Sequence, residues 1–188
     1  STTCALWNRR ESRNEKLAAN TLVATVMSNL GMENYLSSVG VSTVRTGVGD
    51  RYVVESMRAN GYNLGGEQSG HIVLSDFATT GDGLVAAVQV LSLLARKNIP
   101  TTELTSVFEP LPQTLVNVRF TGSSPLEDNR VKASIEEQEK RLSQTGRVLI
   151  RKSGTEPLIR VMTEGEDQEM ILDAANQIRE TIEQVLQS

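Results

Sequence analysis

The first half of the chain alternates between short apolar runs and longer segments in which apolar residues recur at helical spacing. Short runs rich in β-branched residues predict buried strands, and the longer segments predict helices that end near Gly40, Gly61 and Pro100. Strands and helices in regular alternation predict an α/β fold with a mixed, mostly parallel sheet and flanking helices. The predicted strands are 21–27, 41–45, 62–64 and 71–74, and the predicted helices are 29–38, 50–59 and 84–97.

The second half presents its elements in a different order. One strand precedes a charged amphipathic helix, which is followed by two strands around a short turn and by a final helix with one apolar side. This order predicts an α+β domain in which helices cover one face of an antiparallel sheet. The predicted strands are 115–120, 148–150 and 158–162, and the predicted helices are 131–142 and 168–186.

The change of pattern near residues 98–106 predicts a boundary between two domains, at 21–100 and 101–188. A chain of 188 residues is long enough for two domains of about 100 residues each. Residues 1–20 are polar and mixed in charge, and no apolar stripe anchors them. They are compatible with a linker, a connecting segment or an added, non-native start.

Composition narrows the partners and the compartment. With 19 basic and 23 acidic residues the net charge is −4, which argues against a broad nucleic-acid-binding face. The single cysteine, Cys4, can form neither an internal disulfide nor a cysteine-based metal site, as is typical of a reducing compartment. Neither a secretory signal nor an apolar run of about 20 residues is found. We therefore expect a cytoplasmic protein without nucleic-acid or membrane partners.

The turn RKSGTEP between the last two predicted strands is crowded with hydrogen-bond donors. Gly154 can adopt a positive φ, which would let successive backbone N–H groups converge, and Ser153 and Thr155 add hydroxyls. Arg151 offers a planar guanidinium suited to two oxygens of a phosphate. The turn is therefore either an anion-binding loop or a strand connection with solvated polar side chains.

A second polar loop, GGEQSGH at 65–71, follows the third predicted strand. The carboxylate of Glu67 can accept bonds from two adjacent sugar hydroxyls, and Ser69 and His71 can add directional bonds. The alternative is a surface turn with a solvated glutamate. A Ser-His-Asp hydrolase with Ser69 as nucleophile has poor support, because no G-x-S-x-G nucleophile elbow is present.

Two further glycine clusters precede helices. In TGVGDRYV, Asp50 is expected to be the helix N-cap and Arg51 a surface charge, and the cluster lacks the third glycine of a dinucleotide fingerprint. In TTGDG, Asp82 is expected to cap the helix 84–97, because one carboxylate is too few for a Mg²⁺ or Ca²⁺ site. These clusters predict neither a metal site nor a Walker loop.

Three of these stretches together, GGEQSGH, TTGDGLVAAVQVL and RKSGTEPLIRVM, resemble the α-D-phosphohexomutases, and most closely their bacterial phosphoglucosamine mutase branch. The resemblance covers about residues 20–187. It is specific because three motifs occur in the family's order and at its separations. Members have four domains around a central cleft, and this chain resembles only the third and fourth.

The resemblance implies a divided set of functional residues. In the family, a serine of the first domain carries a phosphoryl group, and an Asp-rich loop of the second binds Mg²⁺. Neither loop is found in this sequence, so the resemblance implies that the chain alone is inactive, binds no metal, and works with the missing first and second domains.

The family's site residues carry over to matching positions of this sequence. Glu67 and Ser69 correspond to contacts with sugar hydroxyls, and His71 corresponds to a residue near the reacting end that can assist proton transfer. The far-end phosphate holder corresponds to Arg151, Ser153, Gly154 and Thr155. Asp50 and Arg51 stand where relatives place a further active-site residue, whose type differs between subfamilies.

The implied function is the sugar- and phosphate-binding half of a phosphoglucosamine mutase, which interconverts glucosamine 6-phosphate and glucosamine 1-phosphate. Gln68 and the TTGDG stretch favour glucosamine over other sugars within the family. The alternatives are a phosphoglucomutase or phosphomannomutase, and a free-standing phosphosugar-binding module.

Overall fold

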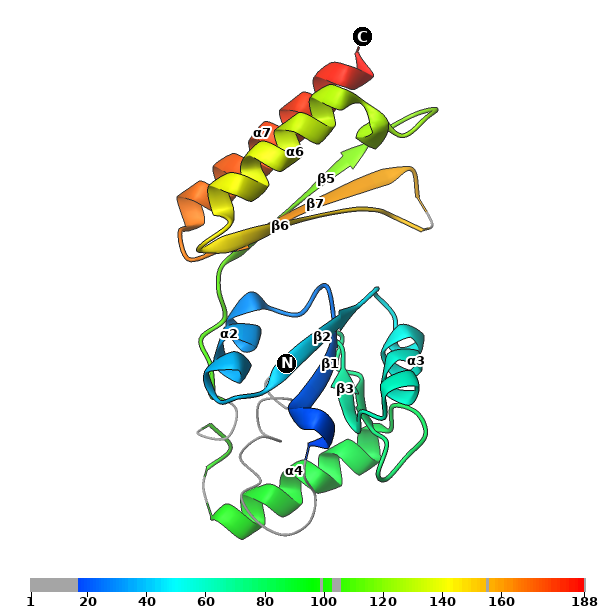
Figure 1. The fold of residues 1–188 in the computed structure, drawn as a ribbon, viewed down its shortest axis with the longest axis vertical. Helices are drawn as coiled ribbons and strands as arrows, with labels where there is room; N and C mark the ends of the chain where they lie inside the picture. The colour runs from blue at the N-terminus through cyan, green and yellow to red at the C-terminus, as the bar shows by residue number, and fades with distance from the viewer. Residues whose placement is uncertain (1–16, 99, 103–105, 155, 188) are drawn as a thin grey trace. The chain divides into compact units, whose positions relative to one another are not determined.

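The computed structural model describes residues 17–187 apart from residue 99, residues 103–105 and residue 155. The chain forms two compact units, Ser1–Pro110 and Leu111–Ser188 (Figure 1). The division lies beyond the segment 98–106 in which the sequence pattern changes. Val107 and Phe108 stay with the first unit because they pack against Leu93 and its apolar neighbours.

A four-stranded sheet in the order β2-β1-β3-β4 forms the centre of the first unit. The first three strands run parallel, and only β4 is antiparallel, to β3. The predicted mixed, mostly parallel sheet is therefore confirmed. The strands are β1 (Thr21–Thr25), β2 (Ser42–Thr46), β3 (Leu64–Gly66) and β4 (Ile72–Leu74).

Helices cover both faces of this sheet. On one face Val53 and Met57 of α3 pack against Val23, and on the other Met32 and Leu36 of α2 pack against the alternate strand residues. Val85 of α4 joins the second of these clusters. The helices are α2 (Leu30–Ser38), α3 (Asp50–Asn60) and α4 (Gly83–Lys97), after a short 3₁₀ turn, η1 (Ala18–Asn20).

The third strand lies later in the sequence than its pattern predicts. Gly65 and Gly66 were expected to begin a loop, and this is wrong, since they are buried in β3. A Cβ atom at Gly65 would lie 2.6 Å from both Met57 Sδ and Val53 Cγ1. Glycine therefore stands in this strand because α3 packs directly against the backbone.

The second unit is a three-stranded antiparallel sheet in the order β5-β7-β6 with two helices. Ile178 and Ile182 of the last helix pack against Ile159 and Val161 of the central strand, so both helices lie on one face of the sheet, as predicted (Figure 1). The elements are β5 (Gln113–Arg119), η2 (Pro125–Glu127), α6 (Asn129–Leu142), β6 (Gly146–Lys152), β7 (Leu158–Gly165) and α7 (Gln168–Leu186).

Candidate functional site

The carboxyl ends of the parallel strands gather three loops at one edge of the first sheet. Thr25 pairs with Thr46, and Ala24 pairs with Gly66, so β1, β2 and β3 end side by side. The chain leaves β1 toward β2 on one side, and later crosses to β3 on the other side. Such an edge, where the strand order reverses, is the usual place for a ligand in an α/β sheet.

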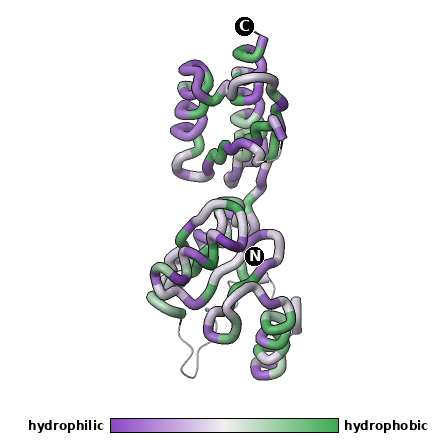
Figure 2. The backbone as a smooth tube through the Cα atoms, turned by 90° about the vertical axis from the view of Figure 1, so that its right-hand side faces the viewer, coloured by the Kyte–Doolittle hydropathy of each residue, from purple (hydrophilic) through white to green (hydrophobic). Residues whose placement is uncertain are grey.

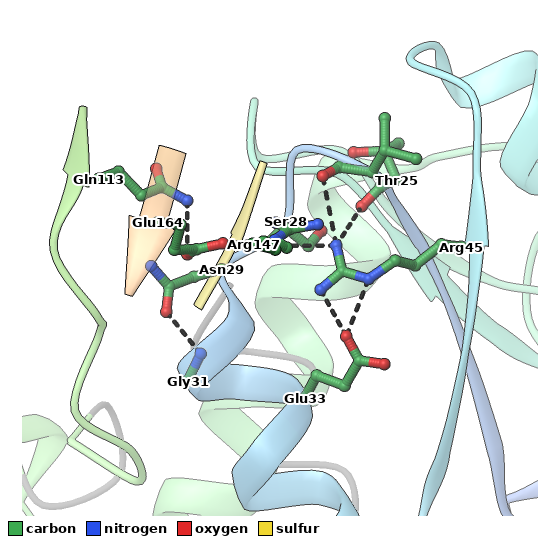
Figure 3. A network of polar contacts seen from close by, with 10 residues as sticks. Thr25, Ser28, Asn29, Gly31, Glu33, Arg45, Gln113, Arg147 and Glu164 are labelled. Carbon is green, nitrogen blue, oxygen red and sulfur yellow. Dashed lines mark hydrogen bonds and ion pairs between the residues drawn. The ribbon is translucent and has the colours of Figure 1, made fainter. Parts of the chain in front are cut away.

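Arg45 makes this edge rigid. Its Nη1 donates hydrogen bonds to the carbonyl oxygens of Val26 (3.2 Å) and Ser28 (3.0 Å), and its Nε donates to Oε2 of Glu33 (2.8 Å) (Figure 3). The loop after β1 is thereby held by one side chain. Sequence analysis missed this arginine, because only strand pairing brings the loop to it.

The GGEQSGH loop forms a tight hairpin between β3 and β4. The backbone N–H of Glu67 donates to the carbonyl oxygen of His71 (2.9 Å), and that of Gly70 donates to Glu67 (3.2 Å). Gly70 has a φ of 100°, which explains why glycine closes the turn. This geometry brings Glu67, Ser69 and His71, all predicted from the sequence, into one short turn.

Two polar features of this hairpin point to a ligand. Glu67 is only 8% exposed, yet its carboxylate has no hydrogen-bond partner within the part of the chain that the structure describes. Ser69 Oγ lies 3.0 Å from His71 Nδ1. The carboxylate oxygens of Glu67 are therefore open to hydrogen-bond donors from outside the hairpin, and the hydroxyl groups of a sugar are donors of this kind.

The next predicted pair, Asp50 and Arg51, opens α3. The expectation that Asp50 caps this helix is wrong: the N-cap is Gly49, with a φ of 131°, and Asp50 is the first helical residue. Asp50 Oδ1 accepts a bond from the backbone N–H of Arg51 (2.7 Å). Arg51 Nε donates to Glu55 (2.8 Å), and this bond raises the pKa of Arg51. Both side chains therefore engage their own helix.

Asp82, by contrast, caps its helix as predicted. Its Oδ1 accepts bonds from the backbone N–H groups of Leu84 (2.9 Å) and Val85 (3.0 Å) at the start of α4. Within the described ranges, no group of three or more His, Cys, Asp or Glu residues could hold a metal ion. The helices of these ranges include none long and apolar enough to cross a membrane.

The turn after β6 differs from its prediction in backbone detail. The N–H of Ser153 donates to the carbonyl oxygen of Leu158 (2.7 Å), which leaves it unable to meet an anion in this conformation. Gly154 does not adopt the expected left-handed φ, and open space surrounds the position of its absent Cβ. Thr155 lies outside the described residues. The backbone of this turn therefore does not form the predicted cluster of converging N–H groups among the described residues.

Arg151 lies directly opposite Arg160 in the register of β6 and β7. Both project to the face of the sheet opposite α6 and α7, the helix-free face, because Ile159 and Val161 face the helices. Burial and then the charge of Arg160 lower the pKa of Arg151. Among the described residues, neither guanidinium has a hydrogen bond or an ion pair.

Two like charges in direct cross-strand opposition repel each other, and an anion bound between them would remove that repulsion. Asn117 of β5 is the other neighbour of Arg160 in the sheet, and it can add a side-chain amide to the same row. Sequence analysis missed Arg160 because its position opposite Arg151 depends on the strand register.

Comparison with known proteins decides the family. The profile of the phosphoglucomutase/phosphomannomutase alpha/beta/alpha domain III matches residues 1–111, and that of the phosphoglucomutase/phosphomannomutase C-terminal domain matches residues 115–181. The chain belongs to the phosphoglucomutase/phosphomannomutase family. The resemblance based on three sequence motifs is thus confirmed. The first match begins at residue 1, and so includes the segment 1–20 that the sequence pattern left unassigned.

Curated members of the family are similar over most of this chain. The phosphoglucosamine mutase of Parvibaculum lavamentivorans is 59% identical over 167 residues, which are 89% of this chain and 37% of that protein. The phosphoglucosamine mutase of Roseobacter denitrificans is 58% identical over 179 residues, 95% of this chain and 40% of that protein. The chain therefore spans well under half the length of these relatives.

Solved structures share the fold at low identity. The N-acetylphosphoglucosamine mutase of Aspergillus fumigatus superposes with a TM-score of 0.76 at 20% identity, over 98% of this chain and 43% of the other. A second structure of that enzyme, in complex with GlcNAc-6P and magnesium, superposes with a TM-score of 0.74 at 20% identity, over 96% of this chain and 45% of the other. The arrangement of elements is therefore that of a phosphohexomutase.

Proposed function

We propose that this chain is the sugar- and phosphate-binding half of a phosphoglucosamine mutase, which interconverts glucosamine 6-phosphate and glucosamine 1-phosphate. The opposition of Arg151 and Arg160 carries the proposal. Their two charges, unpaired among the described residues, form a site whose natural counter-charge is a phosphate. Ser153 and Thr155 of the following turn contribute hydroxyls to the same phosphate.

The first unit supplies the sugar contacts. Glu67 accepts bonds from sugar hydroxyls, which satisfy its buried carboxylate, and Ser69 adds a contact of the same kind. His71 transfers a proton near the reacting end of the sugar, and its Nδ1 is held by the hydroxyl of Ser69. In the imidazolium form Nδ1–H donates to that hydroxyl and the Nε2 proton can pass to the sugar oxygen, which leaves a neutral imidazole. Asp50 and Arg51 lie at the same edge of the sheet and have a lesser role.

The chemistry of a mutase needs a phosphoryl-carrying serine and a magnesium site in addition to contacts with the sugar and its phosphate. A phosphoryl group passes from the enzyme to one end of the sugar phosphate, and the enzyme then recovers the phosphoryl group of the other end. We place the magnesium site and the phosphoryl-carrying serine in the remainder of the complete protein, because this chain spans only 37–40% of its relatives. This half then positions the substrate, and alone it does not catalyse. We place the complete enzyme in the cytoplasm.

Binding to the chain itself tests the phosphate site. We expect titration calorimetry to show glucosamine 6-phosphate binding that Arg151→Ala and Arg160→Ala each weaken at least tenfold. Lys152→Ala is the matched control, because Lys152 is next to Arg151 but lies over the ring of Phe120, 5.5 Å from its centroid. Unchanged binding by both arginine variants would refute the proposed site.

Activity tests the sugar. The matched segment of the Parvibaculum relative can be replaced by this chain to give a complete enzyme. We expect kcat/KM to be higher for glucosamine 6-phosphate than for glucose 6-phosphate or mannose 6-phosphate. A preference for a 2-hydroxy sugar would instead support a phosphoglucomutase or phosphomannomutase.

A further inference from the structure

The helix α4 presents an apolar side that is exposed among the described residues of its unit. Leu84, Val88 and Leu91 are 81%, 60% and 62% exposed, and they are the three most exposed of the large hydrophobic side chains in the described part of the chain. They recur at intervals of four and three residues, so they form one stripe along the helix. Ala87 and Ala95 are exposed beside them.

The opposite side of α4 is already used. Ala86 and Leu93 are each 8% exposed, and Val90 and Leu94 pack with Leu93 and Val107. The helix is thus apolar on both sides, and Figure 2 colours most of its residues as hydrophobic. A helix with only one face against the core normally carries charges on the other, yet Gly83–Ala95 contains no Asp, Glu, Lys or Arg. Such a helix is built to be covered on both sides.

We propose that the stripe formed by Leu84, Val88 and Leu91 is an interface with the portion of the complete polypeptide that this chain does not span. The missing portion can cover the stripe because the relatives are much longer than this chain, which corresponds to only 37–40% of each. The match to a numbered domain III also implies preceding domains in the same polypeptide. An apolar strip of this kind, exposed to water, is typical of a surface that another folded part buries.

Thiol labelling measures this contact directly. With Cys4 replaced by serine, Leu91→Cys provides a single reporter in the stripe. Leu172→Cys provides the control, because Leu172 is 48% exposed on α7, in the other unit. Labelling by a maleimide is compared in this chain and in the complete protein, made by inserting the chain into the Parvibaculum relative. We expect the Leu91→Cys reporter to react at least tenfold more slowly in the complete protein, and the control to react equally in both.

Other occupants give different results. Equal labelling of the Leu91→Cys reporter in both proteins would overturn the proposal. If labelling of this chain alone slows as its concentration rises, the stripe binds a second copy of the chain. If labelling slows only when phosphatidylcholine vesicles are added, the stripe binds a membrane. Either result would overturn the proposal.

A second measurement covers the case in which the reporter perturbs folding. Leu84→Gln, Val88→Gln and Leu91→Gln combined should lower the melting temperature of the complete protein and leave that of this chain within about one degree. An equal change in both proteins would contradict the interface. The inference rests on the family and on chain length, and neither readout needs activity. If the complete protein is inactive but its stripe is shielded from labelling, the proposed function is wrong and the proposed interface still holds.

Discussion

The two ends of the helix-free face in the second unit use arginine in opposite ways. At one end Arg147 lies opposite Glu164, and its Nε donates to that carboxylate (2.7 Å) (Figure 3). Gln113 on the other neighbouring strand donates from its Nε2 to the same carboxylate (2.7 Å), so the three side chains form a row across the sheet. At the other end Arg151 lies opposite Arg160, and no carboxylate joins the row. The two rows are four residues apart on the same pair of strands.

The difference separates a row that is paired within the sheet from a row that we propose to bind phosphate. Glu164 is fully buried, and the bonds from Arg147 and Gln113 compensate for its burial, so this row stabilises the sheet. Arg151 and Arg160 oppose one another, so their charges do not stabilise the sheet, and in the proposed function a bound phosphate compensates for them. A site that holds a ligand thus retains a local cost in the free protein, as strained or uncompensated groups at binding sites often do.

The largest expected effect is at the paired end. Arg147→Ala leaves the buried Glu164 without its charged partner, and we expect the free energy of unfolding of the second unit to fall by about 3 kcal/mol. Urea unfolding followed by hydrogen exchange of the β5–β7 amides measures this loss. Lys140→Ala, on α6, is the control. A loss no larger than that of the control would show that the row does not stabilise the sheet.

At the Arg151 end of the face, replacing an arginine by alanine should weaken phosphate binding and leave the free energy of unfolding nearly unchanged. Arg151→Ala and Arg160→Ala each relieve a like-charge pair, so we expect the free energy of unfolding to stay within about 0.5 kcal/mol or to rise. In the unmodified chain, phosphate at about 100 times its Kd should add about 2.7 kcal/mol of stability, and a variant that binds tenfold more weakly should lose about half of this gain. A variant that unfolds as readily as Arg147→Ala would erase the distinction between the two ends.

Reversing the charge of Arg160 should give the Arg151 end of the face the same ion pair as the Arg147 end. Arg160→Glu places a carboxylate opposite Arg151, as Glu164 lies opposite Arg147. We expect a gain of up to about 1 kcal/mol in stability, together with complete loss of phosphate binding in calorimetry. Retention of phosphate binding by this variant would mean that Arg151 and the turn suffice, and that Arg160 is not part of the site.

The smallest expected effect extends the comparison to two buried glutamates. Glu164 accepts bonds from Gln113 and Arg147, whereas the carboxylate of Glu67 in the first unit, 8% exposed, accepts none from the described residues. Glu67→Gln should therefore leave stability unchanged or raise it by up to about 1 kcal/mol, while sugar binding falls and binding of inorganic phosphate persists. Thermal unfolding and paired titrations with glucosamine 6-phosphate and phosphate test this. Equal loss of both ligands would make Glu67 a structural residue.

Local chemistry was enough to predict much of this protein. Apolar periodicity located the helices and most strands, and the cap at Asp82 follows from an aspartate before an apolar helix. The polar residues of GGEQSGH and RKSGTEP were found as candidate sites because they lie within single turns. Neighbours in the sequence are neighbours in space in such turns, so the sequence alone places them together.

Tertiary structure decided whatever depends on pairing between distant segments. Strand register set Arg160 opposite Arg151 and Arg147 opposite Glu164, and the sequence alone showed no sign of either pairing. The close approach of α3 made Gly65 part of a strand, and packing buried Glu67 without a partner. Sequence thus determined which residues offer hydrogen bonds and charges, and only the fold determined which of those groups are already satisfied.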